Sequence, residues 1–98
     1  MKVKQLEDYY GGASGDAAWH EHVDLARESW VGSPLQTTLL RKVKGDLELA
    51  SVIYAKVGDR SLEWLEMKVP ALHGRKPISC LDSRNLVLRL REALMRMD

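Results

Sequence analysis

The side chains in this sequence best suited to metal or covalent chemistry are His20, His22, His73 and Cys80. His20 and His22 are two residues apart, which turns them roughly 200° from each other on a helix, whereas a helical metal-binding pair is spaced by four. His73 and Cys80 add no standard ligand spacing. A Cys–His nucleophile would need a third, orienting group and a pocket, and the sequence shows neither. Cys80 lies among apolar neighbours, where a reduced cysteine behaves as a small hydrophobe. We expect no metal, no cofactor and no enzymatic activity.

A glycine-rich segment and the charge balance bear on phosphate and nucleic-acid binding. Residues 11–15 read Gly-Gly-Ala-Ser-Gly, but they lack the lysine and the preceding strand of a phosphate-binding loop. The chain carries 15 Lys and Arg against 14 Asp and Glu, so no overall field attracts nucleic acid or an anionic membrane. Any partner must therefore be recognised by a local surface.

Length and composition describe an ordinary globular protein. Of the 98 residues, 45% are hydrophobic and 30% are charged. A domain this small buries only about two-thirds of its unfolded surface, so its stability is marginal and a bound partner would add to it. One cysteine cannot form an internal disulfide, and the sequence shows no signal-peptide core and no apolar run long enough to span a membrane. We expect a cytoplasmic protein.

The N-terminal part divides into an arm and a first helix. Three glycines within residues 11–15 raise the entropy cost of ordering the backbone, so residues 1–15 are predicted to form a flexible arm. A single helical domain, residues 16–98, then begins with a helix capped by Asp16 and ended by Gly32. The apolar residues of this helix recur at spacings of four, three and four and form one stripe: Trp19, Val23, Ala26 and Trp30.

The sequence predicts the start of a second helix from its capping residues. Ser33 is a good N-cap, Pro34 suits the first helical position, and Gln36 completes a capping box. This helix is predicted to run to the Lys44-Gly45 pair, where glycine favours a helix end.

Asp46 opens a third helix that ends at Gly58. The alternative for residues 51–57 is a strand, because several of these side chains favour β-structure. They show no period-two alternation, however, and no second strand is available to pair with them.

The second and third helices, joined by a tight turn, also resemble a helix-turn-helix motif. The would-be recognition helix begins with Asp46 and Glu48 and carries only Lys56, far from its N-terminal end. Acidic groups there would repel phosphates, so DNA binding is possible in principle but not favoured.

Two further helices complete the predicted fold. Asp59 or Ser61 caps a short helix that Pro70 keeps from extending, because proline restricts the residue before it. A final helix covers residues 84–97. We predict an all-α fold, a small single-domain helical bundle of about five helices.

The final helix has two apolar faces. Its broad arc is predicted to face the core and contains Leu86, Val87, Leu90, Ala93, Leu94 and Met97. The solvated opposite face contains Arg89, Glu92 and Arg96. Leu88 and Met95 fall outside the arc, two turns apart, beside Arg84 and Arg91. Because interface cores combine aliphatic residues with Met and Arg, we predict that Leu88, Arg91 and Met95 form a contact strip. The alternative is that they are scattered exposed residues of no special role.

The segment Pro70–Pro77 forms the turn before that helix. Its two prolines restrict the backbone at entry and exit, and Gly74 is free to adopt a positive φ. A rigid turn presents side chains at low entropy cost, so four of its residues are candidates for a recognition surface: Leu72, His73, Arg75 and Lys76. In the alternative, the turn only joins two helices and Leu72 packs inward.

A set of residues in the second half of the chain follows a known pattern. A helix ending in Trp-Leu leads through a proline and a Leu-x-Gly-x-x-Pro turn into a Pro-hydrophobic-x-x-Leu segment and a long final helix. The positions are Trp64, Leu65, Pro70, Leu72, Gly74, Pro77, Ile78 and Leu81, followed by residues 84–97. Over residues 50–98 the sequence thereby resembles the toxin-binding domain of Xre/MbcA/ParS-type bacterial antitoxins.

The resemblance implies a bacterial antitoxin that dimerises and holds a partner toxin inactive. The partners of that family are RES-domain toxins that consume NAD, and the C-terminal end of the antitoxin domain blocks the entrance to their active site. The matching positions here are Arg96, Met97 and Asp98. The rival interpretation is a stand-alone inhibitor or regulator from a phage or mobile element that binds a different protein.

Overall fold

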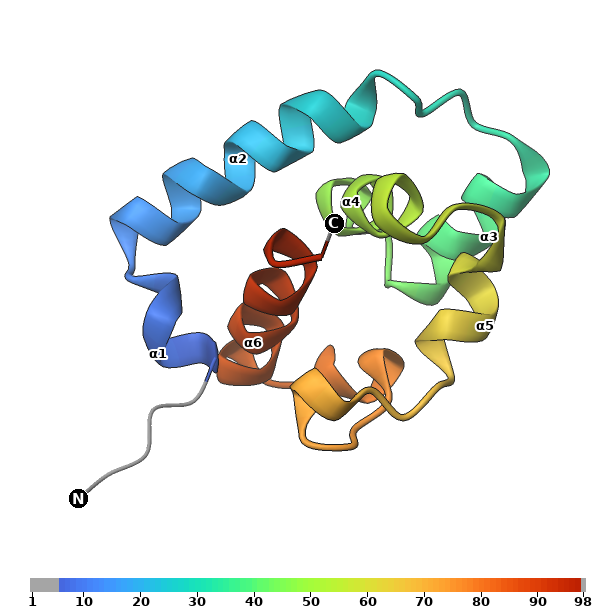
Figure 1. The fold of residues 1–98 in the computed structure, drawn as a ribbon. Coiled ribbons are helices and arrows are strands. Elements are labelled where there is room, and N and C mark those ends of the chain that lie inside the picture. The colour runs from blue at the N-terminus through green and yellow to red at the C-terminus, as the bar shows by residue number, and fades with distance from the viewer. Residues whose placement is uncertain (1–5, 98) are drawn as a thin grey trace.

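The computed structural model describes residues 6–97, and within them the chain is all-α, as predicted. The α-helices are, in chain order, α1 Leu6–Tyr10, α2 Ala13–Arg27, α3 Pro34–Lys42, α4 Leu47–Val57, α5 Ser61–Leu65 and α6 Arg84–Met95 (Figure 1). Three short 3-10 helices are η1 Gly58–Arg60, η2 Pro70–Leu72 and η3 Pro77–Cys80. None of the helices in this described part is long and apolar enough to cross a membrane.

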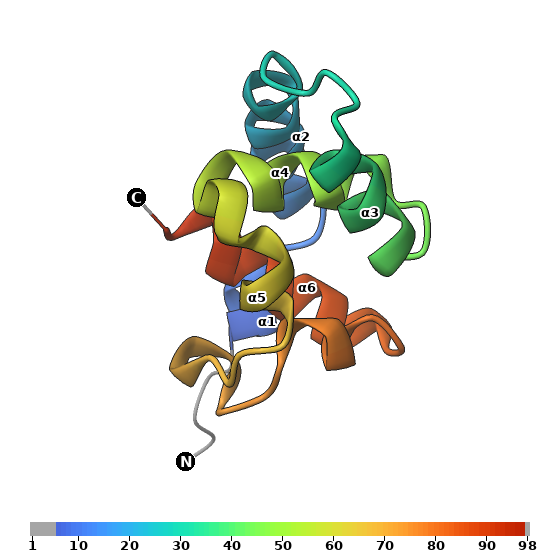
Figure 2. The same cartoon turned by 90° about the vertical axis from the view of Figure 1, so that its right-hand side faces the viewer.

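Helix α4 lies at the centre of the fold, with α2, α3, α5 and α6 packed around it (Figure 2). Five consecutive α4 residues are buried: Leu49, Ala50, Ser51, Val52 and Ile53. The Asp46 side chain accepts a hydrogen bond from the Leu49 amide at 3.1 Å and caps the helix, as predicted. The strand alternative for residues 51–57 is therefore wrong. Burial on all sides, rather than β-pairing, explains the apolar run.

The start of α3 shows the predicted capping box in full. Ser33 Oγ accepts from the Gln36 amide at 3.2 Å. The Gln36 side-chain oxygen accepts in turn from the amides of Val31, Gly32 and Ser33 at 2.8–3.1 Å, and its Nε2 donates to the Ser29 carbonyl at 3.0 Å. Gln36 is only 1% exposed. Its amide therefore satisfies the backbone of the loop that joins α2 to α3.

Helix α2 begins at Ala13, three residues before the predicted cap at Asp16, and it ends at Arg27. Trp19, Val23 and Ala26 are buried along one face, as predicted. Trp30 lies beyond the helix end, where its ring meets Tyr54 of α4 edge to face, with centroids 6.5 Å apart. The stripe thus reaches the core, although its last member does so from a loop.

Residues 6–15 do not form the predicted flexible arm. They form α1 and a tight corner into α2, and α1 packs along α6 (Figure 1). Tyr10 is 3% exposed. A Cβ on Gly15 would lie 1.8 Å from the Tyr10 carbonyl oxygen, so Gly15 allows the close approach of the two helices. The glycines in this segment allow the tight corner between α1 and α2, and they do not make the segment disordered. Residues 1–5 of the predicted arm lie outside the described part.

Candidate functional site

Backbone hydrogen bonds connect the two sides of the turn between α5 and α6. The Val69 amide donates to the Arg75 carbonyl at 3.1 Å, and the Gly74 amide donates to the Val69 carbonyl at 3.0 Å. Gly74 has φ of 76°, the positive value predicted, and His73 before it has φ of 57°. The turn needs two consecutive left-handed residues, a conformation that glycine tolerates better than histidine.

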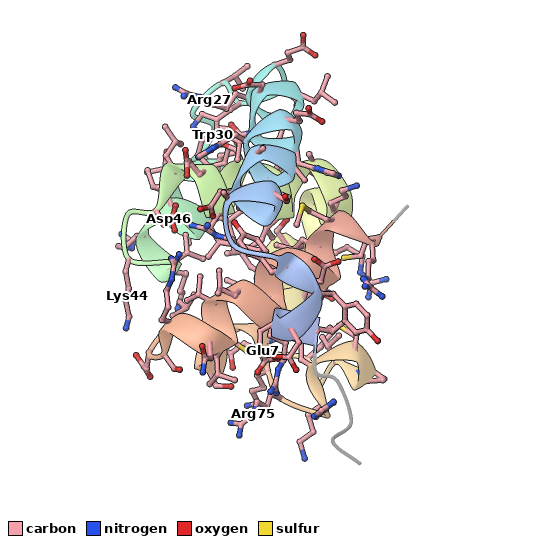
Figure 3. All side chains as sticks on the ribbon, turned by 90° about the vertical axis from the view of Figure 1, so that its left-hand side faces the viewer. Glu7, Arg27, Trp30, Lys44, Asp46 and Arg75 are labelled. Carbon is pink, nitrogen blue, oxygen red and sulfur yellow. The ribbon has the colours of Figure 1, made fainter. Side chains whose placement is uncertain are left out.

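This turn buries one of its candidate recognition residues and exposes three. Leu72 is 0% exposed and belongs to the core, so the alternative in which it packs inward is correct. His73, Arg75 and Lys76 are exposed, and Lys76 lies 3.6 Å from Glu66. Figure 3 places Arg75 at the end of the molecule away from Arg27 and Trp30.

The predicted contact strip on α6 is covered by the chain itself. Arg91 donates to the Tyr10 hydroxyl at 2.9 Å, its guanidinium lies 5.0 Å from the centre of the Trp19 ring, and its side chain is 15% exposed. Leu88 and Met95 are partly buried against the core. The strip is therefore not a free surface in this structure. The packing of α1 and α2 on that side of α6 explains why apolar residues occur outside the main arc.

Arg89, predicted to be solvated, is instead part of the same packing. Its guanidinium donates two hydrogen bonds of 2.9 Å to the Glu7 carboxylate, and the two side chains are 12% and 15% exposed. These bonds hold the pKa of Glu7 below its ordinary value. The ion pair ties α1 to α6.

Tyr10 links α1 to α2 as well as to α6. Its hydroxyl donates to Asp16 Oδ1 at 2.7 Å while accepting from Arg91. Burial, followed by the hydrogen bond to Asp16, raises the pKa of Tyr10. The hydroxyl therefore stays protonated and keeps its role as a donor.

The end of α6 lies in the middle of Figure 1, ringed by the other helices. Arg96 donates to Glu92 at 2.8 Å, and its guanidinium lies 4.9 Å from the centre of the Tyr9 ring. The Met97 carbonyl accepts from Lys56 Nζ at 2.9 Å. Arg84 is exposed at the opposite end of α6. Asp98 lies outside the described residues.

Of three hollows in the structure, two include residues at this end of α6, and the other shares one lining residue with each of them. The first, of about 230 Å³, lies between α2 and α4 and is lined by His22, Leu25, Ala26, Val52, Ala55 and Lys56. The second, of about 330 Å³, lies between α1, α2 and α6 and includes Met95 and Arg96. The third, of about 300 Å³, lies between α4, α5 and the end of α6 and is lined by Lys56, Val57, Arg60, Trp64, Met67 and Met97.

We call these three hollows together the C-terminal face. His22 lines the first and second hollows, and Lys56 lines the first and third. Of the predicted partner-binding residues that the structure describes, only Met95, Arg96 and Met97 line this face. The sequence did not single out Lys56, Arg60 or Met67, because the face forms only when α4, α5 and α6 come together. The 52% exposure of Met67 is a signal that the structure alone provides.

The histidines and the cysteine do not form a common site. His20 lies 3.7 Å from Glu48 across α2 and α4, and the His22 ring nitrogen Nδ1 lies 2.9 Å from the Ala18 carbonyl. Cys80 is buried, as predicted, and burial raises the pKa of its thiol. Within residues 6–97, no three His, Cys, Asp or Glu side chains gather closely enough to hold a metal ion.

The helix-turn-helix interpretation meets a structural obstacle. Helix α4, the would-be recognition helix, is the buried centre of the fold. A recognition helix must instead present a free face to the major groove. Of the basic residues at the end of α3, Lys44 lies just past the helix and pairs with Asp82 at 2.6 Å.

No protein-family model matches this chain, and no curated protein or solved structure matches it either.

Proposed function

We propose that this protein is a cytoplasmic antitoxin that binds and neutralises a partner toxin of the RES-domain, NAD-consuming type. Binding takes place through the C-terminal face, without chemistry of the protein's own. As the resemblance implies, the protein acts as a homodimer. An inhibitor from a phage or mobile element that binds another protein is the rival within the same general class.

The observation that carries the proposal is that the residues assigned to the toxin contact also line hollows of the structure. The resemblance assigns the toxin contact to the end of the final helix, at Arg96 and Met97. Arg96 lines the second hollow, and Met97 lines the third. Concave, partly apolar surfaces are where proteins accept anchor side chains of a partner.

The residues of the resembling pattern also hold positions that require their types. Trp64, Leu65, Leu72 and Pro77 are buried, and Gly74 has a positive φ. The pattern therefore describes a packed framework that positions α6, which supports the proposal that residues 50–98 act as the family domain does.

Co-expression tests the proposal. The protein is produced together with a RES-domain toxin encoded by the neighbouring gene, and growth and cellular NAD are measured. The wild type is expected to restore both. Met97→Asp is expected to abolish the relief, because it places a charge on the partly apolar rim of the face.

Val31→Asp is the matched control, because Val31 is 80% exposed and lines none of the three hollows. It should leave the relief unchanged. If Met97→Asp still relieves toxicity while its circular dichroism is native, the C-terminal face is not the contact. If the wild type gives no relief, the antitoxin proposal itself fails.

A further inference from the structure

One of the three hollows has the lining of a protein-interface core without an acidic side chain among its described lining residues. Interface cores are enriched in aromatic residues, Met and Arg. The hollow between α4, α5 and the end of α6, which we call the α5 hollow, combines Trp64, Met67 and Met97 with Arg60. The hollow beside α1 also contains aromatic residues, Met95 and Arg96, but it includes the acidic Glu92. The hollow between α2 and α4 has neither tyrosine, tryptophan nor methionine in its lining.

The apolar part of the α5 hollow is accessible and adaptable. Met67 is 52% exposed at its edge, whereas Trp64 is 9% exposed. Methionine is unbranched and polarisable, so it adjusts its shape to different occupants. The volume of about 300 Å³ lies at the lower end of the range for small-molecule pockets. That size suits one or two side chains of a partner.

The charged residues described in the lining of the α5 hollow are both basic, Lys56 and Arg60. Arg60 lies 3.2 Å from Glu63, but both side chains are largely exposed, at 77% and 68%, so solvent screens this pair and it opens easily. Lys56 is held at the edge by its hydrogen bond to the Met97 carbonyl. Partner carboxylates would thus find two cations beside an apolar hollow.

We propose that the α5 hollow is the anchor site of the protein, and that it takes a large apolar side chain flanked by carboxylates on the partner's surface. The identity of the partner rests on the proposed function. The chemistry of the anchor does not, because it follows from the lining alone.

Methionine methyl NMR tests the anchor chemistry without the toxin. Met67 and Met97 line the α5 hollow, and Met95 lines the hollow beside α1. The methyl signals of these residues therefore distinguish binding in one hollow from binding in the other. The probe is a short acetylated peptide with one tryptophan between glutamates, and its control has lysines in their place. The glutamate peptide should shift the Met67 and Met97 methyl signals saturably and shift Met95 less. The lysine peptide should bind at least about tenfold more weakly.

Four substitutions sharpen this measurement. Met67→Asp and Arg60→Glu should each weaken glutamate-peptide binding about tenfold or more. Their matched controls are Val31→Asp, an exposed apolar residue outside the three hollows, and Arg41→Glu, an exposed cation outside the three hollows. Both controls should bind as the wild type does. The anchor proposal is overturned if both peptides shift the same signals equally, if Met95 alone responds, or if neither peptide binds.

Co-expression separates the two proposals. If Met67→Asp still neutralises the toxin while Met97→Asp does not, the antitoxin proposal stands and the α5 hollow is wrong. If the wild type fails to neutralise but the glutamate peptide binds as expected, the hollow is an anchor site for a different acidic partner.

Discussion

At the scale of single residues, Gln36 shows how a buried polar side chain stabilises a loop. A capping-box glutamine ordinarily contacts one backbone amide, whereas this one accepts from three and donates to a carbonyl. Gln36 is 1% exposed, so these bonds are made by a side chain that is itself shielded from water.

Gln36→Ala should therefore lower the free energy of unfolding by about 2–4 kcal/mol, which combines a lost cap with the loss of the other hydrogen bonds of this side chain. Urea denaturation followed by circular dichroism measures it. The control is the exposed neighbour Thr37→Ala, which should cost less than about 1 kcal/mol. An equal effect of the two substitutions would show that the Gln36 network is not what holds the loop.

At the scale of elements, the packing of α1 on α6 is the main feature that the sequence did not reveal. Glu7 and Arg89 are 82 residues apart in the chain, so no local pattern links them. A five-residue helix is too short to be stable alone. Its stability therefore depends on the ion pair and on the burial of Tyr10.

The Glu7–Arg89 pair makes the free energy of unfolding depend on pH in the acidic range. Because the pKa of Glu7 is lower in the folded state than in the unfolded chain, its contribution is complete above the unfolded pKa. The contribution is lost as the pH falls from about 4.3, the ordinary glutamate value, through the lowered pKa. Glu7→Gln should cost about 1–2 kcal/mol at pH 7 and reduce the loss of stability below pH of about 4.3.

Urea titrations of both proteins over this pH range measure the effect. The control is Glu63→Gln, which removes an exposed carboxylate whose pair with Arg60 is screened by solvent. This control should keep the acid-dependent loss of the wild type. If Glu7→Gln and the wild type lose stability in parallel below pH of about 4.3, the pair does not stabilise the fold.

At the scale of the whole molecule, local signals predicted more than long-range ones. The all-α class, the Ser33 and Asp46 caps, and the apolar stripe of Trp19, Val23 and Ala26 are confirmed, because each follows from the periodicity or capping of nearby residues. The contact strip stays a prediction, because an apolar face on α6 looks the same in sequence whether a partner or α1 covers it, and here α1 and α2 contact Arg91. Among the described residues, the sequence predicted the C-terminal face only at Met95, Arg96 and Met97, since its other walls come from separate elements.

The affinity of the purified protein for the RES-domain toxin, measured by calorimetry for the wild type and Met67→Asp, tests the central claim most directly. The claim is that a partner anchors on the surface around the end of α6. We predict that the wild type binds, and that Met67→Asp loses about 2 kcal/mol or more of binding free energy, as expected of an anchor position. Val31→Asp, which lies outside the three hollows, should bind as the wild type does. Equal affinity of the wild type and Met67→Asp would contradict the α5 hollow as the anchor site, and no binding by the wild type would contradict the antitoxin proposal.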